Sequence, residues 1–178
     1  MTNPSQIASR LDDLAVSSRL QDLALFTIDG RKDRIDKVEK ILSLLNPGVY
    51  LLGAGPYSQR AVSLMCDEVV IGRLSTPLEA MLDKAVDVFV NDGVGLMPRE
   101  VSRVHCVIYR REANETHDYW VMDKGSSCGT YINGQRLEQS QAECEEEVIR
   151  TSRPLTNGDV ISLGPSRINS FIFADLRG

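Results

Sequence analysis

Hydrophobic positions change their spacing at Asn46-Pro47-Gly48, and this change divides the chain into two regions. Before it, apolar residues recur at intervals of three and four, in one stripe from Ile7 to Leu14 and in a second from Ile35 to Leu45. Such intervals place apolar side chains on one face of a helix. We therefore expect residues 1–46 to form an α-helical N-terminal extension, which either covers part of the following domain or docks a partner or a second copy of the chain.

After the boundary, short apolar runs rich in Val and Ile alternate with Gly, Asn and Asp. Nine of these runs are expected to be strands: Val49–Leu52, Ala61–Met65, Val69–Ile71, Val86–Val90, Cys106–Arg110, Tyr119–Met122, Thr130–Ile132, Val160–Leu163 and Ser170–Phe173. Asn133-Gly134 and Asn157-Gly158 are dipeptides typical of tight hairpin turns. Many short strands separated by turns predict an all-β sandwich over residues 47–178.

Two segments interrupt this rhythm of strands. Leu74–Ala85 has apolar residues at helical spacing after Pro77, which indicates a short helix inserted in a loop. Glu138–Ser152 contains the acidic run Glu145-Glu146-Glu147, which is typical of a solvated loop or a frayed helix.

Composition and charge exclude several classes of protein. The formal net charge is −5, so the chain lacks the general basic field that nucleic acids favour, and we expect no direct nucleic-acid partner. Its longest apolar stretches fall well short of the roughly 20 residues that span a bilayer, and we expect no membrane partner. Met1–Leu20 has acidic and polar residues where a secretory signal has its apolar region. An intracellular protein is therefore expected, in the cytoplasm or nucleus.

The four cysteines are widely separated, and the chain has two histidines to complete a zinc site. Structural zinc sites use closely spaced pairs of ligands. We therefore expect no metal site and reduced thiols. Cys66 and Cys106 adjoin apolar runs, which favours buried thiols that act as small hydrophobic side chains.

Five short motifs occur in a fixed order between the expected strands: Gly72-Arg73, Ser102 to His105, Asp123 to Thr130, Asn133-Gly134 and Asn157 to Gly164. No single motif is specific. Their order closely resembles the pattern of the forkhead-associated family, which is G-R, then S-x-x-H, G-S-x-N-G-T, N-G and G-D-x-I-x-L-G.

The resemblance covers about Pro47 to Leu176 and implies a β-sandwich whose loops at one end bind a phosphothreonine peptide. Phosphate carries close to two negative charges and three acceptor oxygens, so it requires a guanidinium and short donors on a rigid frame. The resemblance implies that Arg73 supplies the charged donors and Ser102 a hydroxyl. It also implies further contacts from Arg103 and Ser127.

Supporting roles follow from the same resemblance, for Gly72, His105, Ser126, Gly129, Thr130 and Asn133. His105 is expected to brace the loop that carries Ser102 through hydrogen bonds. Ser102 and His105 on one loop turn do not supply a nucleophile, a base and an orienting group. We therefore expect a binding module without catalytic residues or a cofactor.

One position departs from the family pattern. Cys128 stands where the family has the asparagine that contacts the peptide main chain, and a thiol is a weak donor and acceptor. Two functions stay open. The first is a module that recruits a threonine-phosphorylated protein, and the alternative is a scaffold that no longer reads phosphate and binds a protein through its N-terminal helices or the Leu74–Ala85 insertion.

The loop before Ser102 also suggests a preference for the ligand's neighbouring residues. Glu100 and Arg99 are adjacent there and have opposite charges. The residue that points inward decides whether a basic or an acidic side chain is favoured. We expect Glu100 to select Lys or Arg.

Overall fold

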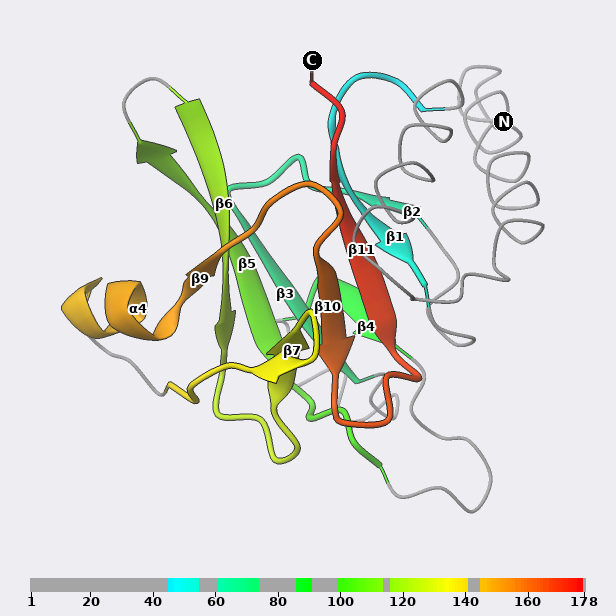
Figure 1. Cartoon of the computed structure of the whole chain (residues 1–178), viewed down its shortest axis with the longest axis vertical. Helices are drawn as coiled ribbons and strands as arrows, with labels where there is room; N and C mark the ends of the chain where they lie inside the picture. Colours follow the sequence, from blue (N-terminus) through cyan, green and yellow to red (C-terminus); the bar gives the residue numbers. More distant parts are fainter. Residues whose placement is uncertain are drawn as a thin grey trace, which may run out of the picture.

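A computed structural model describes residues 45–54, 61–73, 86–90, 99–113, 116–140 and 145–177. Within these residues the chain is mostly β-sheet, arranged in two sheets with a short helix at one side (Figure 1). The helices expected in residues 1–46 and in Leu74–Ala85 lie outside the described residues, apart from Leu45 and Asn46 at the end of the first region.

Each sheet joins strands that are distant in sequence. The first sheet contains, in spatial order, β2 (Ala61–Ser63), β1 (Val49–Gly53), β11 (Ser170–Asp175), β10 (Val160–Leu163), β7 (Thr130–Ile132) and β8 (Gln135–Arg136). The second contains β4 (Val88–Val90), β3 (Glu68–Arg73), β5 (Cys106–Ala113), β6 (Thr116–Asp123) and β9 (Arg153–Pro154). The pairings between these strands are antiparallel, except that β3 and β4 are parallel, with Ile71 opposite Val88.

All nine expected strands are present, with small differences at their ends. The two-residue strands β8 and β9 were not expected, because two residues are too few to show the alternation of apolar and polar positions that indicates a strand. Part of Glu138–Ser152 is helical, as helix α4 (Glu145–Thr151). Asn133-Gly134 joins β7 and β8 in a hairpin, as expected. The expectation of a hairpin at Asn157-Gly158 was wrong, because this turn connects β9 and β10, which lie in different sheets.

The main core lies between the two sheets and takes alternate residues of the longer strands. Leu51, Ile71 and Phe171 have no exposed surface, and Tyr119 packs against Phe173 with ring centroids 5.7 Å apart. Burial of such side chains is the main term that favours folding, at about 1.5–3 kcal/mol for each large apolar side chain. The alternation therefore fixes which face of each strand points inward.

A second apolar cluster uses the other face of the first sheet, through residues of β1, β10 and β11 and the segment after β11. Its buried members are Leu52, Val160, Ile172, Ala174 and Leu176. Leu45, at the end of the second apolar stripe, packs against this cluster. Strands β1, β10 and β11 are thus buried on both faces, which explains their nearly continuous apolar sequences.

The two cysteines beside apolar runs have different environments. Cys106 is fully buried, and burial, together with the nearby Asp123 carboxylate, raises the pKa of its thiol. It therefore stays protonated and acts as a small apolar side chain. The expectation that Cys66 is buried was wrong, because it is exposed in the turn between β2 and β3.

In the part of the chain described above, no helix has the length and apolar character needed to cross a membrane.

The β7–β8 turn depends on Asn133. Its φ of 51° lies in the left-handed region that side chains other than glycine seldom adopt. Its side-chain amide donates to Asp159 at 2.8 Å, and its side-chain oxygen accepts from the Val160 backbone N–H at 3.0 Å. The side chain thus ties this turn to the start of β10.

We predict that Asn133→Gly and Asn133→Ala both lower the free energy of unfolding, by about 1–3 kcal/mol, because the Val160 N–H loses its partner. Asn133→Ala should be the less stable of the two, since alanine pays roughly 1–2 kcal/mol in a left-handed conformation. Urea denaturation followed by tryptophan fluorescence measures both values. Wild-type stability in Asn133→Gly would show that the side-chain bonds contribute nothing.

Candidate functional site

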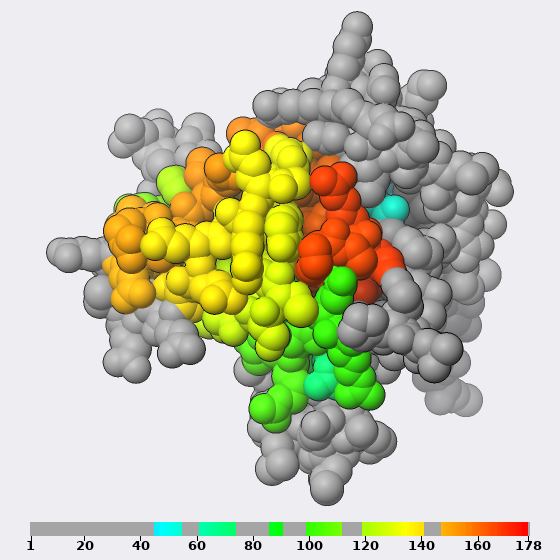
Figure 2. Space-filling model, turned by 60° about the horizontal axis from the view of Figure 1, so that its bottom comes forward, coloured from blue at the N-terminus to red at the C-terminus, as the bar shows by residue number. Residues whose placement is uncertain are grey.

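Several chain segments that carry the motifs gather at one end of the two sheets. The end of β3, the loop before β5, the loop between β6 and β7 and the loop between β10 and β11 all reach this end, which is at the bottom of Figure 1. Figure 2 turns this end forward, and the green, yellow-green and orange-red segments meet there. The motif residues are therefore neighbours in space although they are separated along the chain.

Backbone hydrogen bonds fix the loop before β5 between its neighbours. The Arg73 N–H donates to the Ser102 carbonyl at 2.9 Å, and the His105 N–H donates to the Ile71 carbonyl at 2.9 Å. On the other side, the Lys124 N–H donates to the His105 carbonyl at 2.9 Å. These bonds hold the loop against the end of β3 and the start of the β6–β7 loop.

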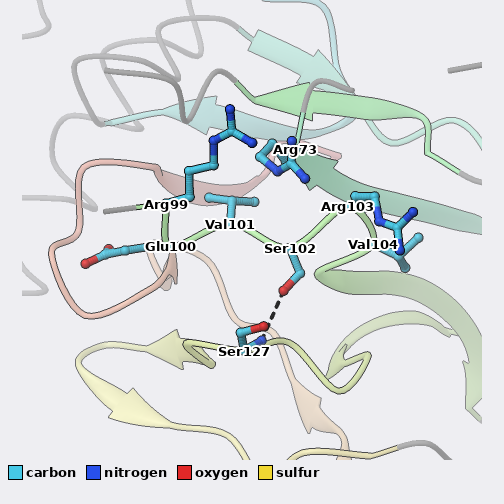
Figure 3. A pocket seen from close by; sticks show the side chains of 8 residues that line it. All are labelled: Arg73, Arg99, Glu100, Val101, Ser102, Arg103, Val104 and Ser127. Carbon is cyan, nitrogen blue, oxygen red and sulfur yellow. Dashed lines mark hydrogen bonds between the residues drawn. The ribbon is translucent and has the colours of Figure 1, made fainter. Parts of the chain in front are cut away.

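A pocket of about 490 Å³ opens at this end, and its lining combines cationic, hydroxyl and apolar side chains (Figure 3). The lining residues are Arg73, Arg99, Glu100, Val101, Ser102, Arg103, Val104 and Ser127. The structure thus brings together Arg73, Ser102, Arg103 and Ser127, which the sequence singled out as ligand contacts. Cys128, at the position where the family has its peptide-binding asparagine, is not part of the lining. Val101 and Val104 were not anticipated, because nothing local distinguishes them from valines of the core.

Gly72 allows the pocket loop to approach β3 closely. A Cβ atom at this position would lie 1.8 Å from the carbonyl oxygen of Arg103, which is far inside van der Waals contact. The obstacle is backbone, so a side chain here would have to displace the loop itself. Glycine before Arg73 is therefore required by the approach of this loop.

His105 is fully buried and uses both of its ring nitrogens. Nδ1 accepts a hydrogen bond from the Ser102 backbone N–H at 3.0 Å, and Nε2 lies 3.2 Å from the Gly129 carbonyl oxygen. Because Nδ1 accepts, the proton must be on Nε2, which donates to Gly129. The imidazole therefore links the loop of Ser102 to the β6–β7 loop.

This arrangement does not fit a catalytic pair. A general base must reach the hydroxyl whose proton it removes. His105 bonds to the backbone of Ser102 instead of its hydroxyl, and both ring nitrogens already serve backbone groups. It acts as a positioning residue.

Ser102 and Ser127 approach each other across the mouth of the pocket. The Ser127 backbone N–H donates to the Ser102 Oγ at 3.0 Å, along the dashed line in Figure 3. The Ser102 hydroxyl thus acts as an acceptor in this bond. A hydroxyl that accepts in this way can still donate its own proton to another group.

A buried carboxylate shapes the β6–β7 loop from within. Asp123 has no exposed surface and accepts from the Ser126 N–H at 2.7 Å and from the Ser126 hydroxyl at 2.6 Å. It also accepts from the Thr130 hydroxyl at 2.7 Å. The Ser126 Oγ in turn accepts from the Gly129 N–H at 2.9 Å. These bonds close the loop on itself and fix the backbone of Ser127.

Gly129 joins three loops through one carbonyl group. Its φ of 87° is open to glycine and strained for other residues, and a Cβ there would lie 2.4 Å from the Arg136 side chain. Its carbonyl oxygen accepts from His105 and also from the Gly164 N–H at 3.0 Å. The loop after β10 is therefore connected to the two loops that line the pocket.

Glu100 is directed toward the loop after β10. Its Oε2 accepts from the Ser166 N–H at 3.1 Å and from the Ser166 hydroxyl at 2.5 Å. In Figure 3 its side chain points away from Ser102, whereas Arg99 extends beside Arg73. This differs from the expectation that Glu100 points inward to select a basic side chain, because its carboxylate is already engaged by Ser166.

Cys128 and Asn133 lie apart from the pocket lining. Cys128 is half-buried with a free thiol, between Ser127 and Gly129. Asn133 follows β7, whereas Thr130 begins it, so the two lie at opposite ends of this strand. Asn133 is thus not a lining residue, and its side chain supports the β7–β8 turn and the start of β10.

The site has the chemistry of an anion receptor. Guanidinium groups, hydroxyls and backbone N–H groups are the donors that phosphate oxygens accept. Across the described ranges, no group of three or more His, Cys, Asp or Glu side chains is placed to hold a metal ion.

Comparisons with solved structures show similar folds. Full-length yeast Pml1p has a TM-score of 0.54 and 20% identity, and the match covers 78% of this chain and 91% of that chain. A second structure, of the yeast Pml1 splicing factor and its integration into the RES complex, has a TM-score of 0.54 and 20% identity and covers 80% and 91%. The FHA domain of CT664 from Chlamydia trachomatis has a TM-score of 0.47 and 18% identity and covers 71% and 96%.

No curated protein matches the sequence of this chain. The family model of the FHA domain matches residues 69–164, from β3 to the residue after β10, and so includes every segment that lines the pocket. Because this match covers more than half of the chain, the protein belongs to the FHA (forkhead-associated) domain family.

Proposed function

We propose that this protein binds threonine-phosphorylated partners and recruits them through the pocket at the loop end of its sandwich. FHA domains are phosphopeptide-binding modules and not enzymes. The observation that carries the proposal for this chain is the convergence of Arg73, Ser102, Arg103 and Ser127 on one pocket.

Arg73 is the main charged donor in this proposal. It ends β3 and is half-buried, and its backbone N–H is already bonded to Ser102. The backbone is thereby fixed, and the planar guanidinium can bind two phosphate oxygens with paired hydrogen bonds. Paired hydrogen bonds from one guanidinium, together with the nearby hydroxyl groups, suit the three acceptor oxygens of a phosphate.

The hydroxyl groups complete the phosphate contacts. Ser102 accepts from the Ser127 N–H, so its own proton is directed elsewhere, and we assign that proton to a phosphate oxygen. Ser127 is exposed on the β6–β7 loop, and Arg103 is exposed on the loop of Ser102. In this proposal both contact the phosphate together with Arg73.

Positioning residues hold these contacts without touching the ligand. We assign this role to Gly72, His105, Ser126, Gly129 and Thr130, and to Asn133 a structural role in the β7–β8 turn. In this proposal residues 47–178 form the binding domain, and residues 1–46 form a helical extension outside it.

Cys128 favours a second candidate function. A half-buried thiol outside the pocket lining offers little to a peptide main chain. The alternative is therefore a scaffold that does not read phosphate and binds a protein partner through its N-terminal segment or the Leu74–Ala85 insertion. Phosphate-dependent binding of any peptide would exclude it.

The first prediction concerns Arg73. Arg73→Ala should weaken binding of a phosphothreonine peptide by about 30-fold or more, because truncation of a charged contact costs about 2 kcal/mol or more. Arg73→Lys should lose less, since lysine keeps the charge but not the bidentate geometry. Isothermal titration calorimetry with a peptide selected from a phosphothreonine library measures the affinities.

Arg150→Ala serves as the matched control. Arg150 is on α4, is exposed and pairs with Glu138 at 3.2 Å, away from the pocket lining. Its substitution should leave peptide affinity unchanged. A folded Arg73→Ala variant with wild-type affinity would contradict the assignment of the pocket, and binding that survives dephosphorylation of the peptide would contradict the proposed function.

The second prediction concerns the phosphorylated residue itself. A phosphothreonine peptide should bind about fourfold more tightly than the matched phosphoserine peptide, because burial of one methyl group contributes about 0.8 kcal/mol. Val101 and Val104 supply apolar surface in the same pocket. Competition titration of the two peptides measures the ratio, and equal affinities would show that the threonine methyl group is not buried.

The third prediction concerns Cys128. Cys128→Asn should strengthen phosphopeptide binding by up to about tenfold, because the amide adds hydrogen bonds worth about 0.5–1.5 kcal/mol each. Cys128→Ala removes the thiol without adding an amide and should leave affinity unchanged. Calorimetry with one peptide compares the three proteins. Equal or weaker binding by Cys128→Asn would show that this site does not clamp the peptide main chain.

A further inference from the structure

The charges that line the pocket do not balance. Its lining contains three arginines, Arg73, Arg99 and Arg103, and one acidic residue, Glu100. The Glu100 carboxylate accepts two hydrogen bonds from Ser166, on the loop after β10. The pocket is therefore cationic overall.

The geometry keeps Glu100 from compensating this charge. An added Cβ atom on Gly164 would lie 2.5 Å from Glu100 Oε2 and 2.6 Å from its Cβ, so the Glu100 side chain runs directly over the Gly164 backbone. The Ser166 contacts hold its outer end. Figure 3 shows the carboxylate directed away from the arginines, while Arg99 extends beside Arg73.

Arg99 is exposed, and within the described residues no carboxylate forms an ion pair with Arg99 or Arg73. Like charges that line one pocket repel each other, and an anionic group that enters the pocket relieves this repulsion. A single phosphate brings close to two negative charges. Arg73 and the hydroxyls of Ser102 and Ser127 already provide the donors for one phosphate. The positive charge of Arg99 is then still available for a second anionic group.

We infer that the ligand carries a second anionic group close to the phosphothreonine, and that Arg99 binds it. This inference rests on the proposed function of the same pocket. The second group is an acidic side chain or a second phosphate, both of which offer the paired oxygens that a guanidinium recognises. Basic neighbours, which the Glu100–Arg99 sequence suggested, are disfavoured because they would add to the cationic charge.

The test uses one neutral peptide and three series of variants that share its phosphothreonine sequence. The neutral peptide has neutral neighbours, and the variants have an aspartate substituted in turn at each flanking position, a phosphoserine at those positions, or a lysine there. The wild-type chain should bind the best aspartate or phosphoserine peptide about five- to tenfold more tightly than the neutral peptide, and the lysine peptide more weakly than the neutral one. The aspartate and phosphoserine arms distinguish the two sources of the anion.

Arg99→Gln should abolish the gain, measured as the ratio of its affinities for the acidic and the neutral peptide, because this ratio cancels any loss of attraction between Arg99 and the phosphothreonine itself. Arg150→Ala on α4, outside the pocket lining, serves as the control and should retain the gain. The gain should also fall as salt rises, since this contact is exposed.

The outcomes separate the two proposals. If the neutral phosphothreonine peptide binds but no acidic neighbour improves affinity, the second-anion inference is overturned and the proposed function stands. The same holds if the gain persists in Arg99→Gln. If binding does not depend on the phosphate, or no peptide binds, the proposed function fails and the inference fails with it.

Discussion

The loop end of this sandwich depends on one hydrogen-bonded junction, the buried imidazole of His105 and the carbonyl group of Gly129. The imidazole accepts from the Ser102 backbone and donates to Gly129, and the same carbonyl accepts from Gly164. Removal of either partner would leave buried polar groups unpaired, at a cost of about 1–3 kcal/mol for each group. Three loops therefore share one fixed point, and the pocket side chains project from a frame that is set before any ligand arrives.

Much of the fold could be predicted from the sequence, because the strands of a sandwich have a local signature. The apolar runs of β1, β7 and β10 are bounded by turn residues, and each strand occurs close to its expected position. The local pattern does not show which strands pair with one another. The parallel pairing of β3 with β4, the two-residue strands β8 and β9 and the exposure of Cys66 all depend on contacts with distant segments.

The residues of the site could also be predicted in part from local motifs, whereas their orientation depends on distant segments. The resemblance to the forkhead-associated pattern singled out Arg73, Ser102, Arg103 and Ser127, and the structure places these four around one pocket. The orientation of Glu100 could not be predicted, because it is decided by Ser166, which lies 66 positions later. A rotation of the backbone would exchange the directions of two adjacent side chains such as Arg99 and Glu100. The contact with the distant loop therefore decides which of them is directed into the pocket.

The closed hydrogen-bond network of Asp123, Ser126 and Thr130 has a consequence for how such a domain can diversify. It holds the β6–β7 loop through side chains that point inward, and none of these bonds uses Arg99 on the neighbouring loop. Arg99 can thus be exchanged without loss of the frame, whereas a change at Asp123 would collapse it. The residues that hold the loops in place and the residues that would choose the ligand are therefore separate sets. A new partner preference can arise by substitution in the second set while the first stays unchanged.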